Sequence, residues 1–559
     1  MYDTKCPVLT ASYFPMIATV DANDRFDRCD AGIREMLAVS GTPSLSYTIV
    51  QRGKTLRTRH FGYRDVANEL VPNDQTRHSI NSMTKAVVAA LTGILASQGV
   101  LDMYAPVKTY LPRFACHDPR FDSEITIVDL LSHRTGITNF DPIWLGSHNA
   151  LLLHRDDTLK TFAALKQCEP FRTSFVYNNW GYEVVAKILE YITKRSLDNL
   201  LAEHIFKPLG MSRTSTSWDL DDGNSAKSYA VLHDLTSVPI GRPDLSPGKV
   251  MEAAGGIKST IEDVTRLYTA YLHAIIDQTE LDTDSTSCSV FHHCRDIVTN
   301  HARLPGTSLR EQGYGAGFVR AQLPGQLGRI SLNPSIGPQP VVGKGSESRL
   351  VLYHHGSMPG STSCVHLIPG LDAFIVVLQN SLAPIDTADF VCQYLLETLL
   401  DAKEPNDYPK LAAEFTAIGL GHMDRIKQEL DGQKRIGTAP RPLCEYSGNY
   451  WNEIKNFFIQ IVEKDGKLQM RLQGRESETF DLVYYKDETF TWWMPYDEIA
   501  RRGRYIGDYA ASYYLINFSS SAGKRIDTLG WAWDSNTPDK MATFTAEPRR
   551  GWLRWYPFG

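Results

Sequence analysis

Segments rich in β-forming residues lie at the two ends of the first 400 residues, and this distribution restricts the fold more than any other feature. Two early segments, 45–51 and 55–62, flank the turn residues Arg52, Gly53 and Lys54, so they predict a hairpin. The later segments are 350–354, 364–368 and 373–379. Helical periodicity dominates the residues between the two groups, as in 85–98, 183–193 and 261–276.

Two early strands and three late strands can pair in one antiparallel sheet. Helical patterns at 26–37 and 389–400 lie just outside these strands in the sequence, so we expect both helices to pack on the sheet. The residues between the strands would then form a mainly helical insert beside it. The predicted class is α+β, because strands and helices do not alternate as they do in a parallel sheet.

The composition changes near residue 440 and indicates a second domain. Residues 401–440 read as a helical, charged linker that ends in a proline-rich stretch. Seven of the ten tryptophans follow Cys444, and short alternating segments such as 457–462, 468–472 and 512–518 are divided by turns. We therefore predict a catalytic-type domain over 1–400, a linker over 401–440 and a small β-barrel-like domain over 441–559.

Charge and hydropathy exclude several classes of function. The chain has 559 residues, which is too long for one ordinary core, and 58 basic against 64 acidic residues give a net charge of −6. We therefore expect neither nucleic acid nor a membrane as a partner. The longest apolar stretch, 86–96, is too short to span a bilayer, and residues 1–30 lack the pattern of a secretory signal. Nine cysteines without framework spacing fit reduced thiols, so a cytoplasmic location is expected. The oligomeric state stays open.

The strongest chemical signal is a serine and a lysine three residues apart at the start of an apolar helical segment. Ser82 and Lys85 would share one helix face, and the serine would lie among the free N–H groups of the helix start. A lysine half-buried against apolar neighbours has a lowered pKa and can accept the serine proton. The alternative is structural, with Ser82 as a helix cap and Lys85 on the surface.

Two further polar groups could complete a site. Tyr177 and Asn179 precede a helical segment; a tyrosine there can shuttle protons, and an asparagine can hold a carbonyl or an amine. His354, Gly356 and Ser357 end a late strand, where the glycine would let a substrate backbone approach and the Ser357 N–H could donate to an oxyanion. Taken singly, these motifs also fit a helix cap and a strand-end turn.

In this order and context, the three motifs S-x-x-K, Y-x-N and H-x-G resemble those of the serine hydrolase family that includes class C β-lactamases, D-Ala-D-Ala carboxypeptidases and related esterases and acyltransferases. Further stretches are similar to the family over roughly residues 25–400; they are 61–66, 125–136, 254–260 and 314–318. The chain is most similar to fungal-type members, which are often linked to secondary metabolism. The residues after Cys444 resemble the lipocalin-like β-domain that some members carry.

The resemblance implies a role for each motif residue. Ser82 would be the acylated nucleophile, and Lys85 and Tyr177 would share the base and acid work in a division that stays open. Asn179 would orient the lysine and the substrate carbonyl. His354 and Gly356 would contribute to substrate binding, and the oxyanion hole would be formed by the N–H groups of Ser82 and Ser357. The family implies no cofactor and no metal.

The third motif differs from the Lys-Thr-Gly form that is usual in β-lactamases. A neutral imidazole at His354 would hold a β-lactam carboxylate poorly, so we expect a small-molecule ester, thioester or amide as the acyl substrate. Hydrolysis is the main hypothesis, and acyl transfer to an alcohol, amine or thiol is the alternative, because both pass through acyl-Ser82. A third hypothesis is an inactive scaffold that binds a ligand in the same pocket.

One other cluster contains residue types that can bind metals. Cys288, His292, His293 and Cys294 lie close together in a polar, loop-rich segment. Their spacing does not match a known zinc pattern, and adjacent residues point to different sides of regular elements. We therefore expect no metal there.

Overall fold

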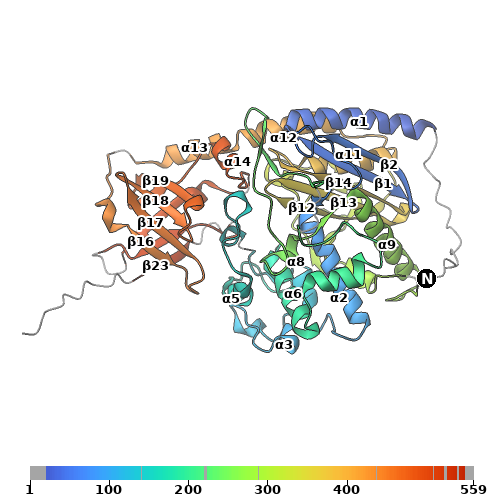
Figure 1. Ribbon diagram of the computed structural model, residues 1–559, viewed down its shortest axis with the longest axis horizontal. Coiled ribbons are helices and arrows are strands. Elements are labelled where there is room, and N and C mark those ends of the chain that lie inside the picture. The colour runs from blue at the N-terminus through green and yellow to red at the C-terminus, as the bar shows by residue number, and fades with distance from the viewer. Residues whose placement is uncertain are drawn as a thin grey trace, which may run out of the picture.

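The structure of the protein is a computed structural model that describes residues 20–547, except for 140, 219–222, 288, 307, 436, 508, 521–524, 535 and 538–540. Its main feature is an eight-stranded antiparallel sheet beside a helical region, with a separate closed barrel formed by the C-terminal part of the chain (Figure 1). The predicted α+β fold with a C-terminal β-barrel is confirmed.

The predicted early hairpin and late strands form five neighbouring strands of the large sheet. In spatial order, the eight strands are β2 (Lys54–Gly62), β1 (Ser44–Gln51), β14 (Ala373–Gln379), β13 (Ser361–Ile368), β12 (Arg349–Met358), β9 (Val319–Leu323), β8 (Gln312–Tyr314) and β7 (Ala302–Arg303). β1 pairs with β14, so Tyr47 lies opposite Val377. The first and last parts of this domain therefore pair within one sheet, near its β2 edge.

Helices cover both faces of the sheet. α1 (Val20–Ser40), α11 (Thr387–Leu400) and α12 (Tyr408–Leu420) share an apolar core with one face, which confirms the two predicted flanking helices. α9 (Ile261–Glu280) packs on the other face against β1 and β14. α12 falls within the predicted linker, but Tyr408 and Phe415 are buried against the helices of this layer.

The helical insert is organised around α2 (Thr84–Ser97). An apolar helix without a polar face must be buried on all sides, and α2 is buried from Thr84 to Leu95. The remaining helices of the insert are α3 (Val107–Tyr110), α4 (Ile127–Leu131), α5 (Thr158–Ala164), α6 (Asn179–Thr193), α7 (Leu197–Leu201), α8 (Glu252–Gly255) and α10 (Cys294–Val298). Small sheets are formed by β3 (His78–Ser79) with β6 (Lys258–Ser259), by β4 (Tyr229–Val231) with β5 (Ser237–Pro239) and β15 (Ser381–Leu382), and by β10 (Gly325–Gln326) with β11 (Val341–Val342).

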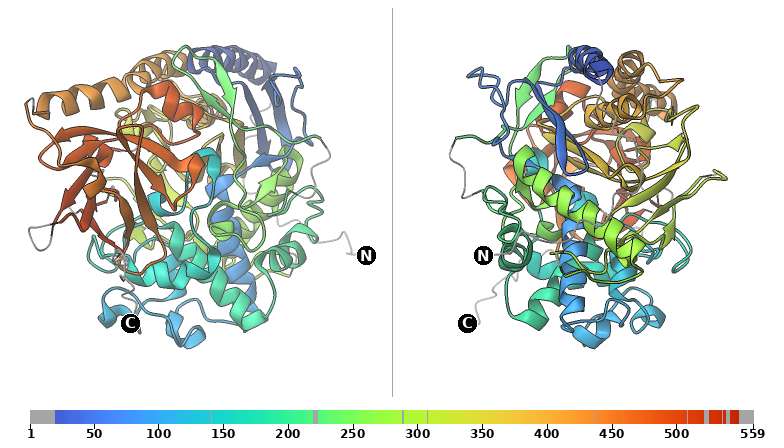
Figure 2. Two further views of the ribbon diagram at one scale, coloured as in Figure 1. Left: turned by 60° about the vertical axis from the view of Figure 1, so that its left-hand side comes forward. Right: turned by 90° about the vertical axis from the view of Figure 1, so that its right-hand side faces the viewer.

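The C-terminal domain is a closed barrel that follows α13 (His422–Gln433). Its strands are β16 (Gly448–Trp451), β17 (Phe458–Lys464), β18 (Lys467–Leu472), β19 (Thr479–Lys486), β20 (Thr489–Thr491), β21 (Leu515–Ser519), β22 (Thr528–Trp531) and β23 (Ala542–Ala546). Trp492 and Trp531 are buried, and their rings lie 5.7 Å apart. The barrel lies beside the insert, and α14 (Tyr496–Arg501) connects two of its strands (Figure 2).

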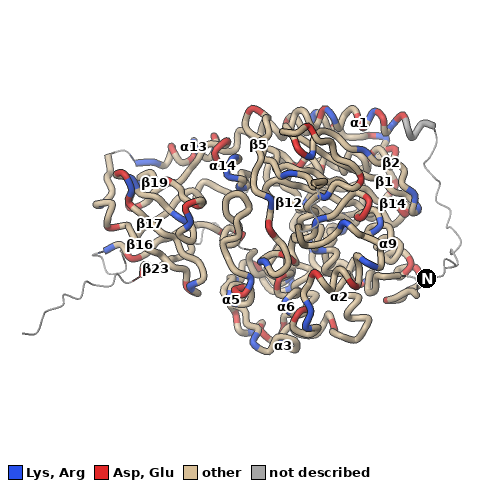
Figure 3. Tube along the Cα trace, viewed as in Figure 1, with Lys and Arg blue, Asp and Glu red and all other residues tan. Residues whose placement is uncertain are grey.

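Acidic and basic residues are interspersed along the trace rather than gathered in one domain (Figure 3). Within the described residues, no helix combines the length and apolar character that crossing a membrane requires.

Candidate active site

The site is built at the start of α2, where the chain turns sharply out of β3. Asn81 adopts a left-handed φ of 49°, and its side-chain amide donates to the Ser361 carbonyl at 3.0 Å. A short 3-10 turn, Asn81–Met83, then leads into the helix, so the Ser82 side chain is half-buried at its first turn. A strained backbone held by a neighbouring strand keeps Ser82 in a fixed position.

Lys85 lies one turn further along and is fully buried. Its Nζ donates to Ser82 Oγ at 3.0 Å and to the Ala254 carbonyl at 2.8 Å. Burial lowers the pKa of Lys85 to about 7, although the carboxylates of Asp141 and Glu183 act in the opposite direction. A substantial fraction of this amine is therefore neutral near pH 7 and able to accept a proton.

Tyr177 approaches the same two residues from the loop before α6. Its ring centroid lies 4.8 Å from Lys85 Nζ, and its hydroxyl has a side-chain hydrogen bond with Ser82. Burial raises the pKa of Tyr177, so the phenol keeps its proton at neutral pH. The structure thus brings together the three residues that the sequence singled out as catalytic.

His133 supports Tyr177, a role that the sequence motifs do not predict. The two rings lie 4.4 Å apart, and the backbone N–H of Asn178 donates to His133 Nδ1 at 3.0 Å. Burial lowers the pKa of His133 well below its usual value, so the ring is neutral. Its only sequence signal was its position in the family-like stretch 125–136.

Asn179 begins α6 and is held by an acidic residue. Its side-chain amide donates to both carboxylate oxygens of Asp141, at 3.0 and 3.1 Å. Burial raises the pKa of Asp141, which also accepts a hydrogen bond from the Trp144 ring nitrogen at 2.8 Å. The described contacts of the Asn179 amide are therefore to Asp141 rather than to Lys85, and Asp141 is a site residue that the sequence motifs did not reveal.

The third motif lies where β12 passes the start of α2. A Cβ at Gly356 would lie 2.3 Å from the Ile80 carbonyl and 2.9 Å from Asn81 Cβ. The glycine is thus required by the approach of this chain's own backbone, whereas the sequence predicts that it admits a substrate backbone. The close contact places Ser357 beside Ser82, and both residues line the same cavity.

His354 differs from the expected substrate-binding residue because its ring is fully buried. Its Nε2 lies 3.0 Å from the Tyr314 hydroxyl, and its Nδ1 lies 2.6 Å from the His355 carbonyl. Burial lowers its pKa well below the usual value, so the ring is neutral. His354 supports the strand from behind and does not line the cavity among the described residues.

Ser82 opens into a cavity of about 430 Å³ that both domains line. The catalytic-type domain contributes Trp144 and Phe175, and the C-terminal domain contributes Arg504, Tyr505 and Tyr509. The Tyr505 hydroxyl lies 3.3 Å from Ser357 Oγ, so the second domain reaches the proposed oxyanion strand.

The candidate metal cluster is only partly described, because Cys288 lies outside the described residues. The Cys294 thiol is buried, which raises its pKa, and its backbone N–H donates to Gln278 at 2.8 Å. His293 lies near Asp284 and Asp296, which are exposed or half-buried.

A serine bonded to a buried lysine at a helix start, beside an inner strand of an antiparallel sheet, is the arrangement of a serine hydrolase. The family model described as Beta-lactamase matches residues 30–399, and a Domain of unknown function, DUF3471, matches 433–546. The chain belongs to the beta-lactamase family.

Similar proteins include a curated hydrolase and two solved structures. The chain is 26% identical over 477 residues to Unguisins hydrolase ungD of Aspergillus violaceofuscus, covering 78% of this chain and 76% of that protein. It is 27% identical to Protein flp of Staphylococcus aureus over 39% of this chain and 43% of that protein. The octameric penicillin-binding protein homologue from Pyrococcus abyssi has a TM-score of 0.53 at 19% identity, covering 90% and 96% of the two chains. The class C beta lactamase from Rhodobacter sphaeroides has a TM-score of 0.52 at 20% identity, covering 67% and 98%. These two structures support the fold.

Proposed function

We propose that the protein hydrolyses an ester, thioester or amide of a small molecule through an acyl-Ser82 intermediate. The observation that carries this proposal is the 3.0 Å contact between Lys85 Nζ and Ser82 Oγ, made by a lysine that burial leaves partly neutral. A nucleophile and its base within hydrogen-bond distance are the defining geometry of covalent acyl transfer.

In the proposed acylation, Ser82 Oγ attacks the substrate carbonyl while its proton passes to Lys85 Nζ. The oxyanion would be stabilised by the backbone N–H groups of Ser82 and Ser357, each of which would lower the barrier by roughly 3 kcal/mol. The tetrahedral intermediate collapses as the bond to the leaving group breaks. The leaving group takes up a proton relayed from Lys85 through the Tyr177 hydroxyl, which is protonated and bonded to Ser82.

Deacylation would follow the same route in reverse. Water attacks the acyl carbonyl and gives its proton to the neutral Lys85, the ester bond to Ser82 Oγ breaks, and the serine recovers its proton. The Asn179 amide, held by Asp141, would fix the side of the cavity that receives the substrate carbonyl.

The cavity wall favours a substrate with an apolar or aromatic part, and it also contains the guanidinium groups of Arg329 and Arg504. Trp144, Phe175, Tyr505 and Tyr509 form much of its wall, and His354 offers no cation for a β-lactam carboxylate. The named activity of the similar unguisins hydrolase also favours hydrolysis of a secondary metabolite over transfer.

Intact-mass spectrometry tests the chemistry directly. Wild-type protein exposed to p-nitrophenyl esters, thioesters and cephalosporins should gain one acyl group on Ser82 with the first two classes, and S82A should gain none. Unchanged acyl-enzyme lifetimes when alcohols, amines or thiols are added indicate hydrolysis, and shortened lifetimes indicate transfer. A folded wild-type protein that no substrate labels would contradict the enzymatic proposal and favour a binding scaffold.

A further inference from the structure

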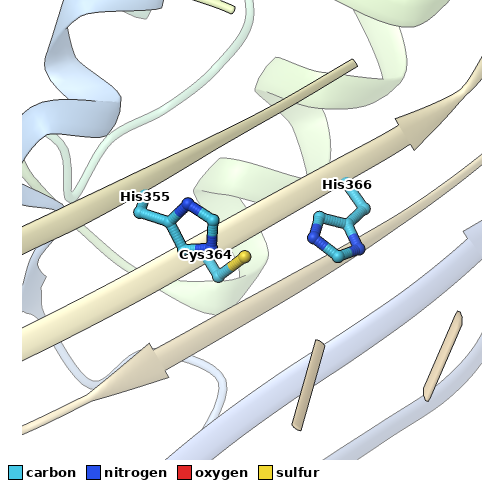
Figure 4. A group of neighbouring side chains, drawn as sticks. All are labelled: His355, Cys364 and His366. Atoms are coloured by element: carbon cyan, nitrogen blue, oxygen red, sulfur yellow. The ribbon is translucent and has the colours of Figure 1, made fainter. Parts of the chain in front are cut away.

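Two histidines and two cysteines meet inside the core, on the face of the sheet that α11 covers. His355 of β12 lies directly opposite Cys364 of β13, and His366 follows two residues later on the same face. One possible ligand atom from each of these three residues lies within 4.8 Å of the others (Figure 4). The catalytic proposal uses none of these side chains.

The fourth member comes from α11. Cys392 is fully buried, and its thiol interacts with both the Cys364 thiol and the His366 ring. Both cysteines are free thiols. The four side chains therefore converge from two adjacent strands and the helix packed on them.

Three ring nitrogens of this cluster lack a close hydrogen-bond partner, whereas the Cys392 thiol lies 3.9 Å from the Ile375 carbonyl and interacts with the His366 ring. Neither ring nitrogen of His366 has a hydrogen-bond partner among the described residues, and neither does His355 Nδ1. Both rings are almost completely buried. Burying an imidazole without a hydrogen bond is costly, so three such atoms at one place call for a ligand that satisfies them together.

The other nitrogen of His355 is already oriented. Its Nε2 lies 3.0 Å from an oxygen of Asp389, which is one helical turn before Cys392 on α11. Metal-binding histidines usually donate their second N–H to a carboxylate in this way, which leaves the first nitrogen free to bind the ion. Here the atom without a partner is Nδ1, which points away from Cys364 in Figure 4, so the ring would have to turn for Nδ1 to reach the ion.

We propose that His355, Cys364, His366 and Cys392 form a binding site for a divalent transition-metal ion, with zinc as the best fit. Two sulfur and two nitrogen donors in a tetrahedral arrangement are typical of structural zinc sites. A tetrahedral zinc ion holds such donors about 3.5 Å apart. The ligand atoms of His355, Cys364 and His366 lie within 4.8 Å of one another, so these side chains and Cys392 would have to move inward on binding. Binding would displace the two thiol protons, and the two thiolates would balance the charge of the ion.

This site would be structural rather than catalytic. It would join α11 to the strand that carries Ser357, and four protein ligands would leave no coordination position open to substrate, although His355 also lines the cavity of Ser82. Because the four residues are buried, an ion would enter during folding and would resist removal by chelators from the folded protein.

The test uses the full chain expressed in medium supplemented with zinc or with cobalt. After dialysis against EDTA, which removes ions from exposed groups such as Asp284 and His293, elemental analysis should find about one ion per chain. The cobalt form should show intense cobalt–thiolate absorption. C364S and H366Q should lower the ion content at least tenfold, and C294S, which alters a buried thiol elsewhere, should leave it unchanged.

Three results would overturn the proposal. One is wild-type protein without a bound ion from either medium, and another is an unchanged ion content in folded C364S. The third is a disulfide between Cys364 and Cys392 in protein purified without reductant. If both variants fail to fold, the cobalt spectrum of the wild-type protein decides, because absorption without a thiolate signature contradicts the proposed ligands.

Discussion

Lys85 is the residue whose protonation should set the pH dependence of the reaction. Only the neutral amine can accept the Ser82 proton, and burial places the pKa of Lys85 at about 7. We therefore expect kcat/KM for a neutral ester to rise as pH increases through about 7 and then to level off. Because the pKa of Tyr177 is raised, the phenol should cause no decline below pH 10.

The measurement is a pH profile of the wild-type protein from 5 to 10 with a substrate that does not titrate. K85A should lose activity by about 10²- to 10⁴-fold, and Y177F should lose activity without moving the midpoint of the rising limb. A rising limb that is unchanged in a residually active K85A protein would show that another group is the base.

The same buried amine should reduce the stability of the folded protein. Its pKa is about 7 in the fold and near 10.5 in the unfolded chain, so the unfolded state binds more protons between these values. The free energy of unfolding therefore decreases as pH falls from 10.5 toward 7. K85M should be inactive and, at pH 7, more stable by about 2 kcal/mol, because an apolar side chain replaces a cation that must deprotonate to be buried.

Chemical denaturation of wild-type and K85M protein at pH 7 and pH 9 checks this. The stabilising effect of K85M should be smaller at pH 9 than at pH 7. At pH 9, keeping Lys85 neutral costs the wild-type protein less free energy. An effect that grows with pH would contradict the assigned direction of the pKa shift.

At the scale of elements, the contact between β12 and the start of α2 determines whether the site forms. G356A adds a Cβ that would lie 2.3 Å from the Ile80 carbonyl, so the strand must move away from Ser82. We expect a loss of at least about 2 kcal/mol in stability and about 10²-fold in kcat, with acylation affected more than KM.

Thermal unfolding and single-turnover acylation measure the two effects. The matched control is G432A in α13, where an added Cβ meets no atom within 4 Å, and this variant should be neutral or slightly stabilising. Normal acylation in G356A would mean that the positions of Ser82 and Ser357 do not depend on this contact.

For the whole molecule, the C-terminal barrel should select substrates. Tyr505 and Tyr509 line the cavity of Ser82, and Tyr505 contacts Ser357. Y505A should raise KM about tenfold for esters with an aromatic acyl group and change kinetics with acetyl esters little, because the lost wall contacts only the larger substrate.

Steady-state kinetics with the two esters gives the comparison, and V483A, on an exposed position of the barrel, is the control. The KM of Y505F should be close to the wild-type value if ring packing dominates. Equal losses for both esters in Y505A would contradict a role in selectivity and point to displacement of Ser357.

The two domains are held together by buried polar contacts as well as by apolar packing. Glu478 of the barrel domain accepts the Ser147 backbone N–H at 2.6 Å, and Asp534 accepts the Thr138 hydroxyl at 2.8 Å. Both contacts reach the segment that carries Asp141, so the barrel is joined to the wall of the cavity.

The sequence by itself determined five of the eight strands of the large sheet, the flanking helices and the barrel, and it pointed to Ser82, Lys85 and Tyr177. These features depend on hydrophobic residues that repeat every two residues in strands or every 3.6 residues in helices, and on polar residues at fixed spacing in one segment. Tertiary structure alone decided that Asp141 holds Asn179, that His354 is enclosed, that Tyr505 reaches Ser357 and that His355, Cys364, His366 and Cys392 converge. Each of these contacts arises from the packing of side chains on different elements, several of them joining distant parts of the chain, and local propensity carries no information about such approaches.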